Sequence, residues 1–170
     1  MSEHDIDIVD DNDVVIGRAS KSEAQQEGLR HRIVRVVLED PSGMILIQKR
    51  QANKELYPGC WDNSASGHVV CGEDYQVAAE RELYEELGVV AKLEQVQYYP
   101  SYREAGWYKL NRFNTLYRSV ILAETTLKLQ VDEVADVRWI SALELRDLVE
   151  NHTTEVADGL IEVYEIMYKP

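Results

Sequence analysis

The chain has 170 residues, of which 45% are hydrophobic and 29% charged, the balance of a globular protein rather than a disordered one. This is the length of one ordinary domain with a single buried core, and no apolar run approaches the roughly 18 residues that a membrane-spanning helix needs. The net charge of −13 argues against DNA or RNA as a partner, but not against a small anion that binds together with cations.

The N-terminal stretch and the cysteines indicate the compartment. Residues Met1–Asp13 are acidic and lack the basic start and apolar run of a secretory signal. Cys60 and Cys71 are too few for a disulfide framework, and two free structural thiols are expected instead. We therefore expect a cytoplasmic protein without a membrane partner.

Apolar periodicity and turn residues predict a mixed order of strands and helices. The first half predicts, in order, a hairpin of Ile6–Val9 and Val14–Ile16 around the polar turn Asp10–Asp13, a helix from Ser20 to about Gly28, and strands Ile33–Leu38 and Met44–Gln48. The second half of the sequence predicts a helix from Asp74 to Leu87, followed by strands Val89–Tyr99 and Asn114–Ala123, which are joined by a connection over Ser101–Arg112. After these come a short strand ending at Trp139–Ile140, a helix from Ser141 to about Glu150, and a last helix containing Leu160, Ile161, Tyr164 and Met167.

The helix from Asp74 to Leu87 has two distinct faces. Its apolar stripe consists of Val77, Ala79, Leu83 and Leu87, and Gly88 ends it. Its other face carries Glu82, Glu85 and Glu86, which are spaced at i, i+3 and i+4. Carboxylates so close repel one another, and hard cations such as Mg²⁺ and Mn²⁺ offset that repulsion. Taken alone, the acidic face is more typical of a solvated helix surface than of a metal site, because charge runs are common on exposed helices.

The residues around this helix distinguish between the two interpretations. In order they are Gly67, five residues, Glu73, seven residues, Arg81-Glu82-Leu83, one residue, Glu85-Glu86, one residue, and Gly88-Val89. This segment, residues 67–89, resembles the Nudix box at every fixed position. The resemblance implies an α+β Nudix fold, a mixed β-sheet sandwiched between α-helices, with the box forming a loop–helix–loop. We expect one such domain over residues 1–170, with residues 1–28 as an N-terminal hairpin and short-helix extension.

The resemblance also assigns roles within the box. The implied ligands of Mg²⁺ or Mn²⁺ are Glu82, Glu85, Glu86 and the carbonyl group of Gly67. Glu73 and Arg81 would pair and hold the loop against the helix. The implied core residues are Leu83, Leu87 and Val89.

The implied reaction is metal-dependent hydrolysis of a diphosphate linkage in a small, nucleoside-diphosphate-like substrate. Glu133, which precedes a predicted strand, is a candidate general base, and an exposed loop acid is the alternative interpretation. The clustered glutamates Glu82, Glu85 and Glu86 are the other catalytic candidates.

A second resemblance is to the Nudix subgroup related to isopentenyl-diphosphate isomerase, over about Ile6–Trp139. The stretches that carry it are Asp7–Asp10, Leu29–Arg32, Gln48–Arg50 with Lys54, Tyr57–Asn63 and Asp132–Val134. In the isomerase, the positions matching Arg50 and Lys54 face the substrate diphosphate, so both are candidate substrate-binding residues, with solvated loop charges as the alternative.

The departures from the isomerase favour hydrolysis. Ser66 stands where the isomerase has its catalytic cysteine, and no Glu-Asn-Glu stretch occurs between residues 106 and 123. His31 and His68 match two metal histidines of the isomerase, but a third would fall at Ala24, so whether they bind metal stays open. An isomerase and a non-catalytic ligand-binding Nudix domain remain the alternatives. A homodimer is also open.

The sequence does not identify the substrate. The aromatic residues that could stack on a base are Tyr57, Trp61, Trp107, Tyr108 and Phe113, and core packing is the alternative for each.

Overall fold

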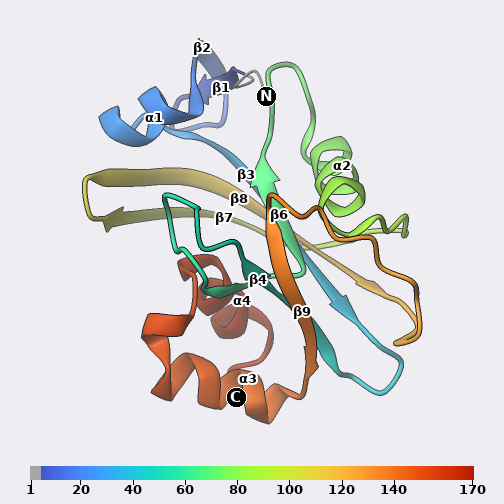
Figure 1. Ribbon diagram of the computed structural model, residues 1–170. Helices are drawn as coiled ribbons and strands as arrows, with labels where there is room; N and C mark the ends of the chain where they lie inside the picture. The colour runs from blue at the N-terminus through green and yellow to red at the C-terminus, as the bar shows by residue number, and fades with distance from the viewer. Residues whose placement is uncertain (1–4) are drawn as a thin grey trace.

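The structure is a computed structural model that describes residues 5–170, so the start of the expected domain at residues 1–4 lies outside the described residues (Figure 1). The strands are β1 (Ile6–Val9), β2 (Val15–Ala19), β3 (His31–Glu39), β4 (Ile45–Arg50), β5 (Trp61–Asp62), β6 (Ala65–His68), β7 (Glu94–Ala105), β8 (Tyr108–Val120) and β9 (Val134–Ile140). The helices are α1 (Lys21–Glu27), α2 (Tyr75–Leu87), α3 (Ala142–Asn151), α4 (Asp158–Met167) and the 3₁₀ turn η1 (Thr153–Glu155). None of the helices in this part of the chain combines the length and apolar composition that a membrane crossing needs.

Strand β3 is the centre of the sheet. It pairs antiparallel with β1, β4 and β6 and parallel with β8, and β4 also pairs with β5 and β9. The parallel pair runs from His31 opposite Arg112 to Glu39 opposite Val120. Residues paired across strands share a face of the sheet, so His31 and Arg112 project to the same side.

Helix α2 covers one face of the sheet, and helices α3 and α4 cover the other (Figure 1). The two-residue period of a strand divides the side chains of β3 between two cores. Val34 and Val36 pack with Leu83 and Leu87 of α2, whereas Val37 packs with Leu160 of α4. The fold is therefore a mixed sheet between helices, and the predicted α+β class is confirmed.

The predicted N-terminal hairpin and short helix are confirmed. Strands β1 and β2 pair antiparallel, and the Asp10 carboxylate accepts hydrogen bonds from the backbone N–H groups of Asn12 and Val14 in the turn. Helix α1 begins after Ser20, whose hydroxyl accepts a hydrogen bond from the Glu23 backbone N–H at 3.1 Å. Turn and capping chemistry thus set these boundaries.

The predictions for the next two long strands were wrong in extent. The segment predicted as a strand from Val89 to Tyr99 becomes a strand only at Glu94. The predicted connection Ser101–Arg112 belongs mostly to the long antiparallel hairpin of β7 and β8, and β8 begins and ends earlier than the predicted Asn114–Ala123. Strand β7 is an exposed edge strand, so its sequence lacks the apolar alternation that marks a half-buried strand.

Two smaller features also differ from the predictions. The short strands β5 and β6 were not predicted, because neither is long enough to show a period. Val77 was expected in the buried stripe of α2, but it is 50% exposed, and the buried positions include Ala78 and Ala79 instead. Leu83, Leu87 and the neighbouring Val89 are buried as expected.

Candidate active site

The segment from Gly67 to Val89 forms the end of β6, a loop and helix α2, which is the expected loop–helix–loop. Asp74 caps the helix, because its carboxylate accepts a hydrogen bond from the Val77 backbone N–H at 2.9 Å. Gly88 ends the helix in the left-handed backbone conformation, with φ of 67°, which glycine adopts without a Cβ penalty. These two residues fix where the acidic face of α2 begins and ends.

Arg81 joins the loop, the helix and strand β6. Its Nε and Nη2 atoms donate to the two carboxylate oxygens of Glu73 at 2.8 and 2.9 Å, and Nη2 also donates to the backbone carbonyl of His68 at 3.0 Å. The hydrogen bonds to Glu73 are the main reason that the pKa of Arg81 is raised. A two-pronged guanidinium–carboxylate contact fixes both distance and orientation, so it orders the loop against α2.

The carboxylate of Glu82 lies directly against the backbone of Gly67. A Cβ placed on Gly67 would come within 2.1 Å of a Glu82 carboxylate oxygen, which no side chain tolerates. Burial raises the pKa of Glu82, and the Arg81 guanidinium, 2.7 Å away, opposes that rise. Only glycine at position 67 allows this carboxylate to approach the end of β6.

Glu86 is the most deeply buried acid of the helix, with 7% of its surface exposed. Its carboxylate accepts hydrogen bonds from the Gln48 side-chain amide at 2.6 Å and from the Ser66 backbone N–H at 3.3 Å. Burial, followed by the nearby charges of Glu82 and Asp62, raises the pKa of Glu86 well above its usual range. Both hydrogen-bond donors are neutral, so its negative charge has no direct cationic partner among the contacts described.

Glu85 differs from the other two acids, because its side chain is 55% exposed and contacts Arg81 at 3.1 Å. Arg81 therefore carries counter-charge to both Glu82 and Glu85. Within residues 5–170, no group of three or more acidic, histidine or cysteine side chains converges closely enough to enclose a metal ion. The helix brings Glu82 and Glu86 together, whereas Glu85 is turned toward Arg81.

The two predicted substrate-binding cations, Arg50 and Lys54, line one cavity. The cavity has a volume of about 360 Å³, and its lining residues are Gln25, Arg50, Asn53, Lys54, Glu55 and Leu56. Arg50, at the end of β4, donates to the carbonyl of Leu56 at 3.1 Å and to the Asp62 carboxylate at 3.3 Å. Arg50 and Lys54 therefore both line a small hollow next to α1.

Glu133, the candidate general base, forms an ion pair with Lys54. Its backbone carbonyl accepts a hydrogen bond from the backbone N–H of Gln51 at 3.1 Å, and the Gln51 side chain donates to the carbonyl of Val131 at 2.7 Å. The segment before β9 is therefore bound to the loop that carries the cations.

His31 and His68 lie on the sheet face opposite α2. Their rings stack at 5.2 Å between centroids, with 18° between the planes. The His31 Nδ1 atom lies 2.9 Å from the carbonyl of Leu29, to which it donates, and its Nε2 atom is buried without a hydrogen-bond partner. Burial lowers the pKa of His31 to about 4, and burial together with His31 lowers the pKa of His68 well below its usual value.

A buried charge network on the same face was not predicted. Arg112 of β8 contacts Asp158 of α4 at 2.5 Å, and Arg35 of β3 contacts Glu162 at 3.2 Å. Arg35 also lies against the α-carbon of Gly159, where a Cβ would come within 1.9 Å of a guanidinium nitrogen. The sequence carries a signal for Arg35, which interrupts the apolar run Ile33–Leu38 of β3, but none for Arg112, because β8 contains several polar residues.

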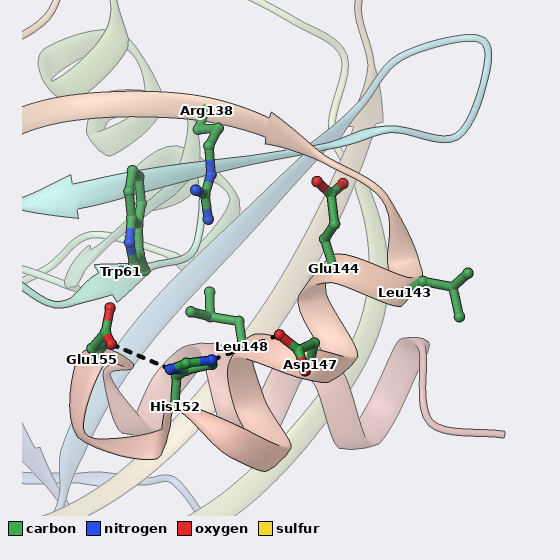
Figure 2. A pocket seen from close by; sticks show the side chains of 8 residues that line it. All are labelled: Trp61, Arg138, Leu143, Glu144, Asp147, Leu148, His152 and Glu155. Atoms are coloured by element: carbon green, nitrogen blue, oxygen red, sulfur yellow. Dashed lines mark ion pairs between the residues drawn. The ribbon is translucent and has the colours of Figure 1, made fainter.

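The candidate aromatic residues differ sharply in exposure. Trp61, Tyr108 and Phe113 are buried, whereas Trp107 is 59% exposed. Figure 2 shows Trp61 in the wall of a second cavity, of about 460 Å³, formed with residues of β9, α3 and η1. The Arg138 guanidinium lies 4.6 Å from the centre of the Trp61 ring, and the cavity belongs to the α3 side of the sheet, away from the box.

Comparison with known proteins gives the same assignment as the box. The NUDIX domain model matches residues 29–160. The chain is 34% identical over 146 residues to an isopentenyl-diphosphate Delta-isomerase 2 of Photorhabdus laumondii, covering 85% of this chain and 81% of that protein. It is 36% identical over 144 residues to an uncharacterized Nudix hydrolase of Listeria monocytogenes, covering 84% of this chain and 82% of that protein.

A solved structure supports the fold. A crystal structure of a protein from Deinococcus radiodurans superposes with a TM-score of 0.79 at 23% identity, and the match covers 97% of this chain and 99% of that one. At this identity the likeness concerns the fold alone. The family model and the two sequence relatives go further, and with the intact box at residues 67–89 they show that this chain belongs to the Nudix hydrolase family.

Proposed function

We propose that this protein is a metal-dependent hydrolase that cleaves the diphosphate linkage of a small, nucleoside-diphosphate-like substrate. The observation that carries the proposal is the contact between Glu82 and Gly67, which brings a box carboxylate to the end of β6 beside the buried Glu86. Glu82 is paired with Arg81, but the described hydrogen-bond donors of the buried Glu86 are both neutral, and a buried charge beside a second carboxylate is costly unless a cation balances it.

The proposed ligands of Mg²⁺ or Mn²⁺ are Glu82, Glu85, Glu86 and the carbonyl group of Gly67. They offer only oxygen donors, the type that both hard cations prefer. Glu86 fits this role because its two described hydrogen-bond donors are neutral. When bound, the metal would neutralise phosphate oxygens and lower the pKa of the attacking water. Glu85 would then leave Arg81, whose fork with Glu73 remains.

The remaining roles follow from the cavity beside α1. Arg50 and Lys54 line it and would bind the diphosphate, because paired cations stabilise its negative oxygens. A water oxygen bonds to phosphorus, the bridging P–O bond breaks, and the second phosphate group leaves with the bond's electron pair. Glu133, next to Lys54, is our candidate acceptor of the water's proton.

The test is a substrate screen with Mg²⁺ and with Mn²⁺ that scores the phosphate or phosphomonoester products formed from nucleoside diphosphates, dinucleotides, sugar nucleotides and prenyl diphosphates. We expect hydrolysis of at least one class, and its loss in EDTA. Binding of a diphosphate without turnover under any condition would identify a non-catalytic ligand-binding domain instead.

Isomerisation of isopentenyl diphosphate is the second candidate, favoured by the name of the Photorhabdus relative and by the stacked His31 and His68. The side chains around that pair argue against it. Ser66 lacks the thiol, and β8 presents Arg112 and Asn114, not acids, next to the histidines. We expect no isomer formation from isopentenyl diphosphate with metal present, and turnover near that of a working isomerase would reverse the assignment.

A further inference from the structure

Asp62 is a buried carboxylate that lies beside both parts of the candidate active site. It is only 4% exposed, and strands β4 and β5 pair with Asp62 opposite Gln48, so the two side chains share a face of the sheet. Gln48 donates to Glu86, and Arg50 comes two residues after Gln48 on β4, which returns it to the same face. Asp62 is therefore a neighbour of both the Gln48–Glu86 contact and Arg50.

The carboxylate of Asp62 is held on both of its oxygens. Oδ1 accepts hydrogen bonds from the backbone N–H of Asn63 at 2.8 Å and from the side-chain amide of Asn63 at 3.1 Å. Oδ2 accepts a hydrogen bond from Nη1 of Arg50 at 3.3 Å. Because Asn63 fixes this carboxylate, the carboxylate in turn fixes one terminal nitrogen of the guanidinium group.

Arg50 is thereby held at two of its three nitrogens. Nε donates to the carbonyl of Leu56 at 3.1 Å and Nη1 donates to Asp62, whereas Nη2 has no hydrogen-bond partner among residues 5–170. The Arg50 side chain is 24% exposed and lines the cavity of about 360 Å³, and Asp62 is not part of that lining. A planar guanidinium group held in this way loses less side-chain entropy on binding an anion than an unrestrained one.

We infer that Asp62 is a positioning residue that holds Arg50 so that its Nη2 atom is available in the cavity for a phosphate group of the substrate. This inference rests on the proposed function and adds a residue to it. The two oxygens of Asp62 are already used by Asn63 and Arg50, so Asp62 acts through Arg50 and not on the substrate itself.

The experiment measures binding by calorimetry on the full chain, with Ca²⁺ present and inorganic pyrophosphate as the probe. Arg50→Ala should raise the Kd of pyrophosphate about 10- to 100-fold, the range of a lost hydrogen bond to a charged group. Asp62→Ala should raise it about tenfold, and the double variant should bind no more weakly than Arg50→Ala, because Asp62 then has nothing to position. The control is Asp136→Ala, an exposed acid on β9, which should leave the Kd unchanged.

The direction of the change is informative by itself. Removing a negative charge near a bound anion would tighten pyrophosphate binding if Asp62 acted only through its charge, so a weaker affinity indicates a loss of positioning. Asp62→Asn is the second variant, since it keeps nearly the same shape and its melting temperature shows whether it is folded. The amide has only one oxygen for the donors of Asn63 and Arg50, so its Kd should also rise. Mn²⁺ binding without pyrophosphate should persist in both variants.

The outcomes separate this inference from the hydrolase proposal. An unchanged or lower Kd in Asp62→Asn, losses that add up in the double variant, or no pyrophosphate binding to the wild type would overturn the positioning role of Asp62. A non-additive loss together with no hydrolysis in the screen would keep the positioning role and overturn the hydrolase. Hydrolysis in the screen together with additive losses would do the reverse.

Discussion

The carboxylate of Glu82 occupies the space that a side chain at Gly67 would fill, since a Cβ there would come within 2.1 Å of its oxygen. Gly67→Ala should therefore displace Glu82 without straining the backbone of the β6 strand. A displacement of about 1 Å at a catalytic group costs on the order of 100-fold in rate, and we expect a loss of that size in the hydrolysis of the best screened substrate.

The matched control is Gly17→Ala, because nothing lies within 4 Å of a Cβ at Gly17. Its rate and its melting temperature should stay at wild-type values. A Gly67→Ala variant with an unchanged rate would show that the position of Glu82 is unimportant for catalysis.

Glu86→Gln should abolish most of the activity while the fold persists. The amide has nearly the same shape and removes a buried charge, so the free energy of unfolding in metal-free buffer should hold or rise by about 1 kcal/mol. The rate should fall by orders of magnitude, because an amide is a poor ligand for a hard cation. Stability by denaturant titration, Mn²⁺ binding by calorimetry and hydrolysis rate are compared with Glu80→Gln, an exposed acid on the same helix. Full activity of Glu86→Gln would refute the metal role.

Arg81→Ala should behave differently, with both stability and rate reduced. It removes the fork to Glu73 and the hydrogen bond to the His68 carbonyl, and leaves Glu82 without its cationic partner. We expect the free energy of unfolding to fall by about 2–4 kcal/mol. The control is Arg146→Ala, which removes an exposed ion pair with Glu150 on α3. This variant should lower the free energy of unfolding by less than about 1 kcal/mol. Equal costs for the two variants would contradict an ordering role for Arg81.

The box was predictable from the sequence because its spacing is local. Glu82 and Glu86 reach the same site by the helical period alone, and Asp74 and Gly88 mark the ends of the helix by capping chemistry. The position of Glu85 was less predictable, because its contact with Arg81 depends on a choice of side-chain rotamer. Spacing determines which residues share a face, but it does not determine which of them are buried.

Long-range pairing was the part that the sequence did not reveal. Gln48 binds Glu86 from β4, and Arg112 reaches Asp158 from a strand whose start was expected to be loop. Such contacts depend on strand register, and the exposed strand β7 has no apolar alternation that would mark its register against β8.

The stacked histidines predict a pH dependence of stability. Burial lowers the pKa of His31 from 6.5 to about 4 in the folded protein, so below pH 6.5 the unfolded chain takes up a proton that the folded chain does not. The stability gained by keeping His31 neutral in the fold is fully present above pH 6.5, and it is lost as the pH falls toward 4. We expect His31 to lower the free energy of unfolding by about 1–2 kcal/mol when the pH is reduced from 7.5 to 5.

Denaturant titrations in metal-free buffer at both pH values test this on wild type and on His31→Gln, whose loss on acidification should be smaller. His152→Gln, on the exposed end of α3, should retain the wild-type dependence. Identical pH dependences for wild type and His31→Gln would mean that His31 is not kept neutral by the fold.

Asp158 should be one of the residues on which stability depends most. It lies 2.5 Å from Arg112, and both side chains are nearly inaccessible to solvent. Burial alone would raise the pKa of Asp158, but the guanidinium groups of Arg112 and Arg35 outweigh burial and lower it below the usual value. Asp158→Asn leaves two buried cations with one anion fewer. Removing one partner of a buried ion pair generally costs about 3–5 kcal/mol, and we expect the free energy of unfolding to fall by about that amount.

The direction in which stability changes with pH follows from the lowered pKa of Asp158. The stabilisation from Asp158 is present above about pH 4 and is lost as the pH falls through its folded-state pKa, so Asp158→Asn should flatten the acid limb of the stability profile. The control is Asp147→Asn on α3, whose side chain is 63% exposed and should change the free energy of unfolding by less than about 1 kcal/mol. Urea titration at pH 7 and pH 3.5 separates the two variants. If Asp158→Asn proved as stable as Asp147→Asn at pH 7, the buried network would not hold α4 against the sheet, and its two arginines would have to find other anionic partners.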